Sequence, residues 1–434
     1  MNPNTREIAA SQIVEIDQGS RLDEITAKYE KPSSILSRLE QRDKAFVRLM
    51  TRVTLRRLGQ IDDIINHFLK RPLHKKNIKQ RALLRVGVAQ LVFLKTPPHA
   101  AVNATVAAAG KDPLKGLINA ILHRVSEQGE EIVNNQDVAR LNSPNWLWNQ
   151  LENSYGSEIA RDIITAQLAE PPTDLTLKKS SFPIKNKLVG EILAPSTIRI
   201  YDAGKIDELP GYDEGDWWVQ DFAATLPAII LLNALSKKPK DSTIADLCAA
   251  PGGKTAQLAL SGSTVFSVEY NQDRIKKIES NITRLKLNVN LVFEDVTKWS
   301  PSEKFDGILL DAPCSATGTI RRHPDLPWRK NLASASNLLP TQDALLKAAV
   351  KHLKPKGVLV YCVCSLDQRE GKDRIANLLN TNPNLHPLPI LPSEIGGLKE
   401  AITENGNVQT LPCHLVEKGG MDGFFISRLK LDSL

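Results

Sequence analysis

The sequence predicts an α/β domain with a mostly parallel, doubly wound sheet, preceded by an all-helical domain and a small α+β segment. From Ser242 onward, strand-like and helix-like stretches alternate, which is typical of a parallel sheet covered by helices on both faces. Near the N-terminus, apolar and basic residues instead recur at helical spacing. A length of 434 residues suggests two or three domains. We therefore expect domains at residues 1–128, 129–236 and 237–434.

The helical pattern of the first domain recurs in several stretches. Pro- and Gly-containing segments such as Arg71-Pro72 and Thr96-Pro97-Pro98 separate them. The expected helices span residues 38–58, 61–69, 78–94, 100–110 and 115–125.

Positive charge is concentrated in this domain. Residues 1–124 hold 22 Lys and Arg and 11 Asp and Glu, which gives them a net charge of +11. Because the whole chain carries +7, the remainder carries −4. A solvated helical surface is one interpretation. The asymmetry favours the other, a surface that binds a polyanion.

The middle segment mixes element types. One helix is expected over residues 146–170, ended by Pro171-Pro172, and strand-like and turn-like pieces follow as far as Asp216. Trp217–Asp221 then leads into a helix that extends through Leu235, and residues 236–241 form a linker.

The last domain carries the strongest alternation. Strands are expected at residues 243–248, 264–269, 289–294, 305–310 and 358–362, with a further one at 423–431, and helices at 255–260, 273–286, 341–353 and 370–380. Ligands of such sheets bind at the carboxyl ends of the strands.

Composition excludes several classes of protein. No apolar run is long enough to cross a membrane, and the N-terminal residues lack the apolar stretch of a secretory signal, so a cytoplasmic location is expected. Five cysteines in a long chain are expected to be free thiols. One Cys-x-Cys pair is weak evidence for a metal, and none is expected. Nothing requires more than a monomer.

The loop after the first strand of the sheet, Asp246–Thr255, contains Gly252 and Gly253, which permit a tight turn and close approach of a ligand. Gly253-Lys254-Thr255 resembles the end of a Walker A loop, but Cys248 occupies the position of its first glycine. A G-x-G-x-x-G fingerprint is absent, and an ordinary strand-to-helix turn remains an alternative.

Three acids stand at the ends of successive strands: Glu269, Asp295 and Asp311. A strand-end carboxylate accepts hydrogen bonds from ribose hydroxyls, and Asp295 is placed to meet an adenine amino group. A single such acid is more often a solvated or capping group. Three in order, without a basic cluster for phosphates, favour a nucleoside with a positive centre, such as S-adenosylmethionine.

Two cysteines follow adjacent strands. Asp311-Ala312-Pro313-Cys314 follows the fourth strand and Cys364-Ser365 the fifth. Taken alone, each is more often a small buried apolar residue. Together, beside a carboxylate, they suit methylation of cytosine at C5. A thiolate added at C6 makes C5 nucleophilic and later departs, while Asp311 is placed to hydrogen-bond the base at N3 and N4.

These motifs resemble those of the RNA cytosine-5 methyltransferases of the Sun type. Leu247–Thr255, Asp311–Cys314 and Cys364-Ser365 carry the resemblance, and Ser315–Asp325 and Gly420–Phe425 extend it. His99–Asn103 and Lys115–Leu122 resemble the NusB family of RNA-binding domains. Together they point to the bacterial Fmu/Sun branch, which implies a Rossmann-like class I methyltransferase fold and a 16S ribosomal RNA substrate.

The resemblance also implies roles for individual residues. Cys364 would be the attacking thiolate, Cys314 would help release the product, and Asp311 would be both catalytic and cofactor-binding. Arg321, Arg322 and His323 lie where RNA would pass, with a solvated loop as the alternative. The other residues implied to bind S-adenosylmethionine are Cys248, Ala249, Ala250, Pro251, Gly252, Gly253, Lys254, Glu269 and Asp295.

The chain departs from this family's pattern at two places. Val363 stands where the family usually has Thr before the nucleophile, and Leu175–Lys179 replace an Arg-Val-Asn-like stretch. Two other functions therefore stay open: a non-catalytic RNA-binding or ribosome-assembly factor, suggested by Val363, and a nucleotide-binding enzyme of another class, suggested by Gly253-Lys254-Thr255.

Overall fold

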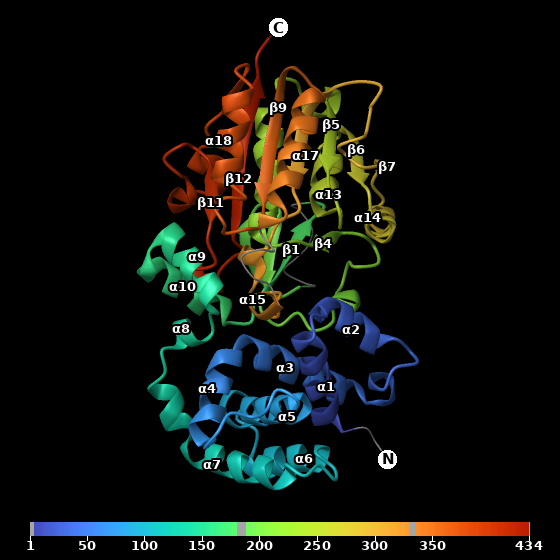
Figure 1. The fold of residues 1–434 in the computed structure, drawn as a ribbon. Coiled ribbons are helices and arrows are strands. Elements are labelled where there is room, and N and C mark those ends of the chain that lie inside the picture. Colours follow the sequence, from blue (N-terminus) through green and yellow to red (C-terminus); the bar gives the residue numbers. More distant parts are fainter. Residues whose placement is uncertain (1–3, 180–187, 330–335, 434) are drawn as a thin grey trace. The chain divides into compact units, whose positions relative to one another are not determined.

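The computed structural model describes residues 4–179, 188–329 and 336–433, and the chain forms two compact units (Figure 1). The first comprises the chain up to Leu168 and a short later segment that begins at Arg322. The second comprises Ala169–Arg321 and the chain from Leu332 onward. The division at residues 128 and 236 stays a prediction.

The described residues of the first unit form helices joined by loops, without a strand, as the sequence predicts. Its buried core draws apolar side chains from several helices, among them Ile13, Met50, Ile61, Leu84 and Leu122. The π-helical turn Ala89–Phe93 directly continues α5. The helices are α1 (Thr5–Asp17), α2 (Leu22–Glu30), α3 (Gln41–Arg56), α4 (Leu58–Phe68), α5 (Ile78–Val88), α6 (Pro98–Ala108), α7 (Lys115–Asn134), α8 (Val138–Leu141), α9 (Asn145–Tyr155) and α10 (Ser157–Gln167).

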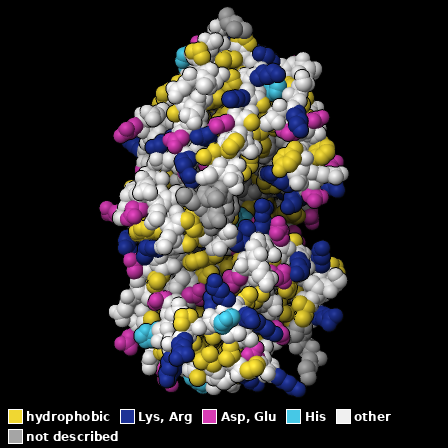
Figure 2. All heavy atoms as spheres, viewed as in Figure 1, with side chains coloured by type: hydrophobic (Ala, Val, Ile, Leu, Met, Phe, Trp, Pro, Cys, Tyr) yellow, Lys and Arg dark blue, Asp and Glu magenta, His cyan; other side chains and the backbone are white. Residues whose placement is uncertain are grey.

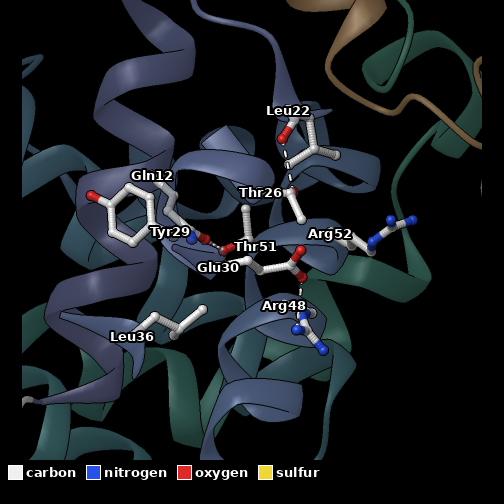
Figure 3. A pocket seen from close by; sticks show the side chains of 9 residues that line it. All are labelled: Gln12, Leu22, Thr26, Tyr29, Glu30, Leu36, Arg48, Thr51 and Arg52. Carbon is white, nitrogen blue, oxygen red and sulfur yellow. Dashed lines mark hydrogen bonds and ion pairs between the residues drawn. The ribbon is translucent and has the colours of Figure 1, made fainter. Parts of the chain in front are cut away.

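Polar contacts join α1, α2 and α3 around a small pocket (Figure 3). The hydroxyl of Thr51 donates to Oε1 of Gln12 over 2.7 Å, and Nη2 of Arg48 donates to Oε1 of Glu30 over 2.7 Å. The Gln12 and Thr51 side chains are buried, so each must find a partner inside the unit. This pair fixes α1 against α3.

The prediction of a single helix over residues 146–170 is wrong. The structure has two helices, α9 and α10, because Gly156 adopts φ 82° and the helical path turns there. A glycine takes this backbone conformation at little cost, so the apolar pattern continues across the break while the helix does not.

The later segment of the first unit contains α15 (Leu326–Arg329). Oδ2 of Asp325 accepts hydrogen bonds from the Leu22 amide at 3.2 Å and from Nε of Arg329 at 2.7 Å. The indole of Trp328 donates to the Leu55 carbonyl over 2.9 Å. Residues far apart in sequence are therefore bound into the same helical unit.

The second unit begins with a four-stranded antiparallel sheet in the order β2-β3-β1-β4. Its strands are β1 (Thr173–Leu177), β2 (Glu191–Ala194), β3 (Thr197–Ile200) and β4 (Trp217–Val219). Asp174 and Arg199 form an ion pair of 2.7 Å with both side chains fully buried, and Arg199 also donates to the carbonyls of Lys418 and Gly420. The predicted mixed segment thus includes a small sheet.

The large sheet has eight strands, seven of them in the order β10-β12-β9-β8-β5-β6-β7, with β11 paired to β12. Pairs among β5 to β9 are parallel, and β12 pairs antiparallel with its neighbours. The predicted, mostly parallel sheet is confirmed. Its strands are β5 (Thr243–Leu247), β6 (Thr264–Glu269), β7 (Asn290–Phe293), β8 (Phe305–Asp311), β9 (Leu353–Val363), β10 (Leu385–Pro387), β11 (Val408–Thr410) and β12 (Phe424–Leu431).

Helices cover both faces of this sheet (Figure 1). Alternate residues of one strand enter opposite cores: Val360 and Cys362 pack with α12, and Tyr361 and Val363 pack with α17 and α18. This is the period-two alternation of a strand buried on both sides. The helices are α12 (Phe222–Ala234), α13 (Gly253–Leu260), α14 (Gln272–Arg284), α17 (Leu339–Lys351) and α18 (Lys372–Thr381).

Lys and Arg side chains are spread among acidic ones over the visible face of the helical unit (Figure 2). Among the described residues, no helix has the length and apolar character needed to span a membrane.

Candidate active site

The loop between β5 and α13 holds its shape through two backbone features. Gly252 adopts φ 98°, and a Cβ there would lie 3.2 Å from Cγ2 of Ile278. Cys248 also has positive φ, at 59°. The hydroxyl of Thr255 donates to Oδ2 of buried Asp246 over 2.5 Å, which ties the first turn of α13 to the end of β5. The sequence-predicted turn is therefore confirmed as a tight, strand-to-helix loop.

A cavity of about 550 Å³ opens beside this loop. Cys248, Glu269, Asp295 and Pro313 are among its lining residues, so the ends of β5, β6, β7 and β8 all contribute. Ala249 to Lys254, predicted to bind the same ligand, are not among the lining residues. Of the three strand-end acids predicted from the sequence, Glu269 and Asp295 line this cavity.

The two acids of this cavity differ in their surroundings. Glu269 is buried, and its Oε1 accepts a hydrogen bond from the Asn271 amide at 3.1 Å. Its Oε2 accepts no hydrogen bond from the described residues, although Nη2 of Arg274 lies 3.4 Å away. Hydrogen bonds from Thr297 lower the pKa of Asp295, which therefore stays ionised at neutral pH. A buried carboxylate oxygen that accepts no hydrogen bond from the described residues fits a ligand that brings hydroxyl donors, as a ribose does.

Asp311 does not line this cavity but lies beside Lys254. Its Oδ2 is 2.7 Å from Nζ of Lys254, and the thiol of Cys362 donates to its Oδ1 over 3.5 Å. The parallel register of β8 and β9 pairs Asp311 with Cys362 and explains that contact. Burial, the largest single influence, lowers the pKa of Lys254, but the charge and hydrogen bond of Asp311 together with Cys362 and Asp246 outweigh it, so the pKa of Lys254 is raised.

Cys314 and Cys364 meet after the ends of β8 and β9. Their Sγ atoms are 3.4 Å apart, and all five cysteines are free thiols in this structure. The hydrogen bond with Cys364, followed by burial, raises the pKa of the Cys314 thiol well above its usual value. Burial first, and then the charge of Asp311, raises the pKa of Cys362 in the same direction. Both thiols therefore stay protonated at neutral pH.

Cys248 is a third protonated thiol. Burial, with the nearby charge of Glu269, raises its pKa. The thiolate form is thus disfavoured at Cys248, Cys314 and Cys362, all of which stand near the site.

The sequence analysis expected Arg321 either where RNA would pass or in a solvated loop, and both expectations are wrong. Its side chain is 1% exposed, so it is no part of a solvated loop, and Nε lies 3.3 Å from Oδ1 of Asp422. Its Nη1 donates to the Gly419 carbonyl over 3.0 Å. Arg322 and His323 belong to the segment of the helical unit, where Nδ1 of His323 lies 3.4 Å from Oδ2 of Asp23. Sequence alone did not show that a basic run would divide in this way.

Glu370 is a site residue that sequence reasoning missed. It was assigned to a helix expected at residues 370–380, but α18 begins at Lys372, and the buried Glu370 carboxylate binds the residues that follow both cysteines. No local pattern marks it, because its partners include residues from distant parts of the sequence.

Comparison with known proteins agrees with this geometry. The model of the family described as "16S rRNA methyltransferase RsmB/F" matches residues 232–430, and that of the "NusB family" matches residues 3–127. "Ribosomal RNA small subunit methyltransferase B" of Salmonella paratyphi C (strain RKS4594) is 32% identical over 454 aligned positions, which cover 98% of each chain.

Solved structures show the same fold. The crystal structure of PH0851 superposes with a TM-score of 0.74 at 21% identity and covers 99% of both chains. NSun6 from Pyrococcus horikoshii, solved with SFG, superposes with a TM-score of 0.55 at 21% identity over 66% of this chain and 98% of its own.

The sheet, the cavity at its strand ends and these matches define an S-adenosylmethionine-dependent methyltransferase with an N-terminal NusB domain. More narrowly, the chain belongs to the RsmB/F family of ribosomal RNA small-subunit methyltransferases.

Proposed function

We propose that this protein methylates C5 of a cytosine in 16S ribosomal RNA through a covalent adduct between Cys364 and C6. The observation that carries the proposal is the 3.4 Å approach of the Cys314 and Cys364 sulfurs after the ends of β8 and β9, the strand that Asp311 ends and its neighbour. C5 of cytosine is a poor nucleophile. Addition of a thiolate at C6 makes C5 nucleophilic, which gives a cysteine at this place a chemical role.

The family resemblance and the position after β9 support Cys364 as the nucleophile. Burial raises the pKa of the neighbouring Cys362 thiol, so Cys362 is not suited to attack as a thiolate. Cys364 remains, half-buried just after the end of β9. Val363, which replaces the usual Thr, is buried in the core that contains Leu359 and Tyr361, and Cys314 packs against this same core, whereas Cys364 packs against the core on the other face of the sheet.

The reaction then proceeds through this chain's own groups. The thiolate of Cys364 forms a bond to C6 while Asp311 hydrogen-bonds the base, and C5 becomes nucleophilic. When bound, S-adenosylmethionine supplies the methyl group to C5. A base then removes the C5 proton, the electron pair of that C–H bond forms the C5–C6 double bond, and the S–C6 bond breaks to return the Cys364 thiolate. Cys314, whose sulfur lies 3.4 Å from that of Cys364, is placed to assist this release.

Glu269 and Asp295 would hold the cofactor from the cavity side. The Oε2 of Glu269, which accepts no hydrogen bond from the described residues, suits ribose hydroxyls, and Asp295 suits the adenine amino group. Lys254 holds Asp311 through their 2.7 Å ion pair, so we assign it to orienting that acid. Ala249 to Gly253 would shape the loop rather than contact the ligand through side chains.

The basic excess of residues 1–124 supports a role for the NusB domain in binding RNA phosphates, with an affinity that falls steeply with salt. The cytosine must be unpaired or flipped, because C6 is out of reach inside a stack. We place this activity in the cytoplasm and expect a monomer. Retention of both cysteines at contact distance argues against a non-catalytic assembly factor.

The test is to incubate the protein with deproteinised 16S rRNA and methyl-labelled S-adenosylmethionine, then digest the RNA and identify the labelled nucleoside. We expect label in 5-methylcytidine, its loss in Cys364→Ala and its retention in the matched control Cys413→Ala. Cys314→Ala should accumulate a protein–RNA adduct that survives denaturation. Label that persists in Cys364→Ala would move the nucleophile elsewhere.

A further inference from the structure

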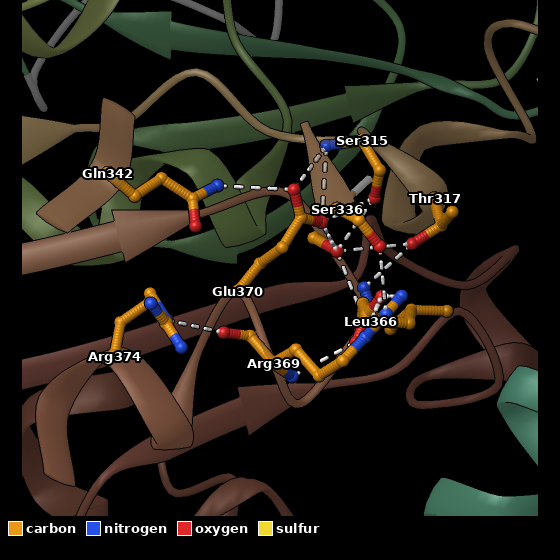
Figure 4. A network of polar contacts seen from close by, with 10 residues as sticks. Ser315, Thr317, Ser336, Gln342, Leu366, Arg369, Glu370 and Arg374 are labelled. Carbon is orange, nitrogen blue, oxygen red and sulfur yellow. Dashed lines mark hydrogen bonds and ion pairs between the residues drawn. The ribbon is translucent and has the colours of Figure 1, made fainter. Parts of the chain in front are cut away.

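The buried carboxylate of Glu370 belongs to a network of polar contacts that includes Ser315 and Gln342 (Figure 4). Its Oε1 accepts from the Ser315 amide at 2.9 Å and from Nε2 of Gln342 at 3.1 Å. Its Oε2 accepts from the hydroxyls of Ser315 and Ser365, each at 2.5 Å. Ser315 and Ser365 directly follow the two cysteines in the chain.

The hydrogen bonds around Glu370 continue from one loop to the other. The hydroxyls of Ser315 and Ser365 are 3.0 Å apart, and the Gly318 amide donates to the Cys364 carbonyl over 3.0 Å. Hydrogen bonds to an ionised carboxylate are stronger than neutral ones. Glu370 is therefore the shared acceptor of a network that spans both loops.

The donors to Glu370 are amides and hydroxyls rather than cations. The two neighbouring arginines engage other acids: Arg369 binds Asp367 at 2.6 Å and Arg374 binds Asp343 at 2.6 Å. The carboxylate is thus directed at the two loops instead of serving a surface ion pair.

We propose that Glu370 is a positioning residue for methyl transfer, whose carboxylate holds the Ser315 and Ser365 loops so that the sulfurs of Cys314 and Cys364 meet at one reacting site. The reaction itself rests on the function proposed above. Small displacements of reacting groups reduce reaction rates strongly. Holding the two sulfurs at a fixed separation therefore keeps the rate of methyl transfer high.

A second effect of Glu370 acts in the same direction. After the hydrogen bond with Cys364 and burial, the negative charge of Glu370 contributes to the raised pKa of Cys314. Glu370 therefore acts on Cys314 through its charge as well as through the hydrogen bonds of the Ser315 loop.

The first test measures the geometry without any reaction on RNA. Wild type and Glu370→Gln are equilibrated in reduced and oxidised glutathione, and the Cys314–Cys364 disulfide is quantified by peptide mass spectrometry. We expect the effective concentration of the two thiols to fall at least tenfold, which shifts the potential of the pair by about 30 mV. Glu394→Gln, which weakens the 2.6 Å ion pair with Arg428 in the same unit, should leave the potential unchanged.

The second test measures single-turnover methyl transfer on 16S rRNA. For Glu370→Gln we expect a rate at least thirtyfold lower, while the KM for RNA and the Kd for S-adenosylmethionine stay within threefold of wild type. Glu394→Gln should transfer at the wild-type rate. If Glu370→Gln does not fold, Ser365→Ala removes one donor to Glu370 and takes its place in both tests.

The outcomes separate the two proposals. An unchanged potential and an unchanged transfer rate in Glu370→Gln would overturn the positioning role and leave the function intact, and an equal loss in Glu394→Gln would also overturn it. A shifted potential, with no 5-methylcytidine formed even by wild type, would support the control of cysteine geometry and overturn the proposed reaction.

Discussion

Replacing Gly318 by Ala should disrupt the packing of the Cys314–Cys364 site. A Cβ at Gly318 would lie 2.0 Å from the carbonyl oxygen of Gly423 and 2.8 Å from its Cα. Both contacts are with backbone, so no side-chain rotation relieves them. The Gly318 amide donates to the Cys364 carbonyl over 3.0 Å, and the Gly423 amide donates to the Gly318 carbonyl over 2.9 Å.

The expected cost follows from these contacts. Overpacking costs about 1–3 kcal/mol, and two hydrogen bonds lost or lengthened add about 1 kcal/mol each. The free energy of unfolding of the catalytic unit should therefore fall by about 3–5 kcal/mol, which lowers Tm by about 6–20 °C for a unit of this size.

The assay is urea unfolding followed by tryptophan fluorescence, together with thermal unfolding. Gly116→Ala is the matched control, because Gly116 lies in α7, where a Cβ would have no neighbour within 4 Å, and alanine is the better helix former. A free energy of unfolding for Gly318→Ala within about 0.5 kcal/mol of wild type would refute the reasoning, since ordinary surface substitutions fall in that range.

Three further predictions concern buried charge. Lys254→Met leaves the Asp311 carboxylate without its 2.7 Å partner and should reduce methyl transfer at least a hundredfold, as measured in single turnover; a wild-type rate would contradict the assignment. Arg199→Met leaves fully buried Asp174 unpaired and should cost about 3–5 kcal/mol in urea unfolding; a loss smaller than about 1 kcal/mol would show that the site relaxes around the unpaired acid. Burial raises the pKa of Asp246 to about 7, so its stabilising contribution is complete below its unfolded pKa and is lost as pH rises from there through 7. Wild type should therefore lose about 2–3 kcal/mol relative to Asp246→Asn between about pH 5 and pH 8, and parallel stabilities of the two proteins would exclude this shift.

Sequence patterning predicted the elements of the large sheet closely, because strands buried on both faces form short apolar runs between turn signals. It failed at Gly156, where apolar spacing continues through a break, and at Leu353, where β9 begins before the apolar run from Val358. A hydrophobic pattern indicates which side chains are buried, but it does not specify the backbone conformation that places them.

The residues of the candidate site also include some that the sequence placed correctly and some that it did not. Cys314, Cys364, Glu269 and Asp295 were found from sequence because each follows or ends a strand whose carboxyl end faces the ligand side of a parallel sheet. Arg321 was misjudged because its partner, Asp422, lies far along the chain.

The sequence by itself determined the helical NusB domain and the parallel sheet, since these depend on local periodicity and on motifs within a few residues. Only the tertiary structure decided that Lys254 pairs with Asp311, that Arg321 is buried, and that Glu370 joins the two cysteine loops. The Lys254–Asp311 contact spans 57 positions of the chain, and the contact between Ser315 and Glu370 spans 55. The geometry of such contacts is set by strand register and helix packing, which no local pattern encodes.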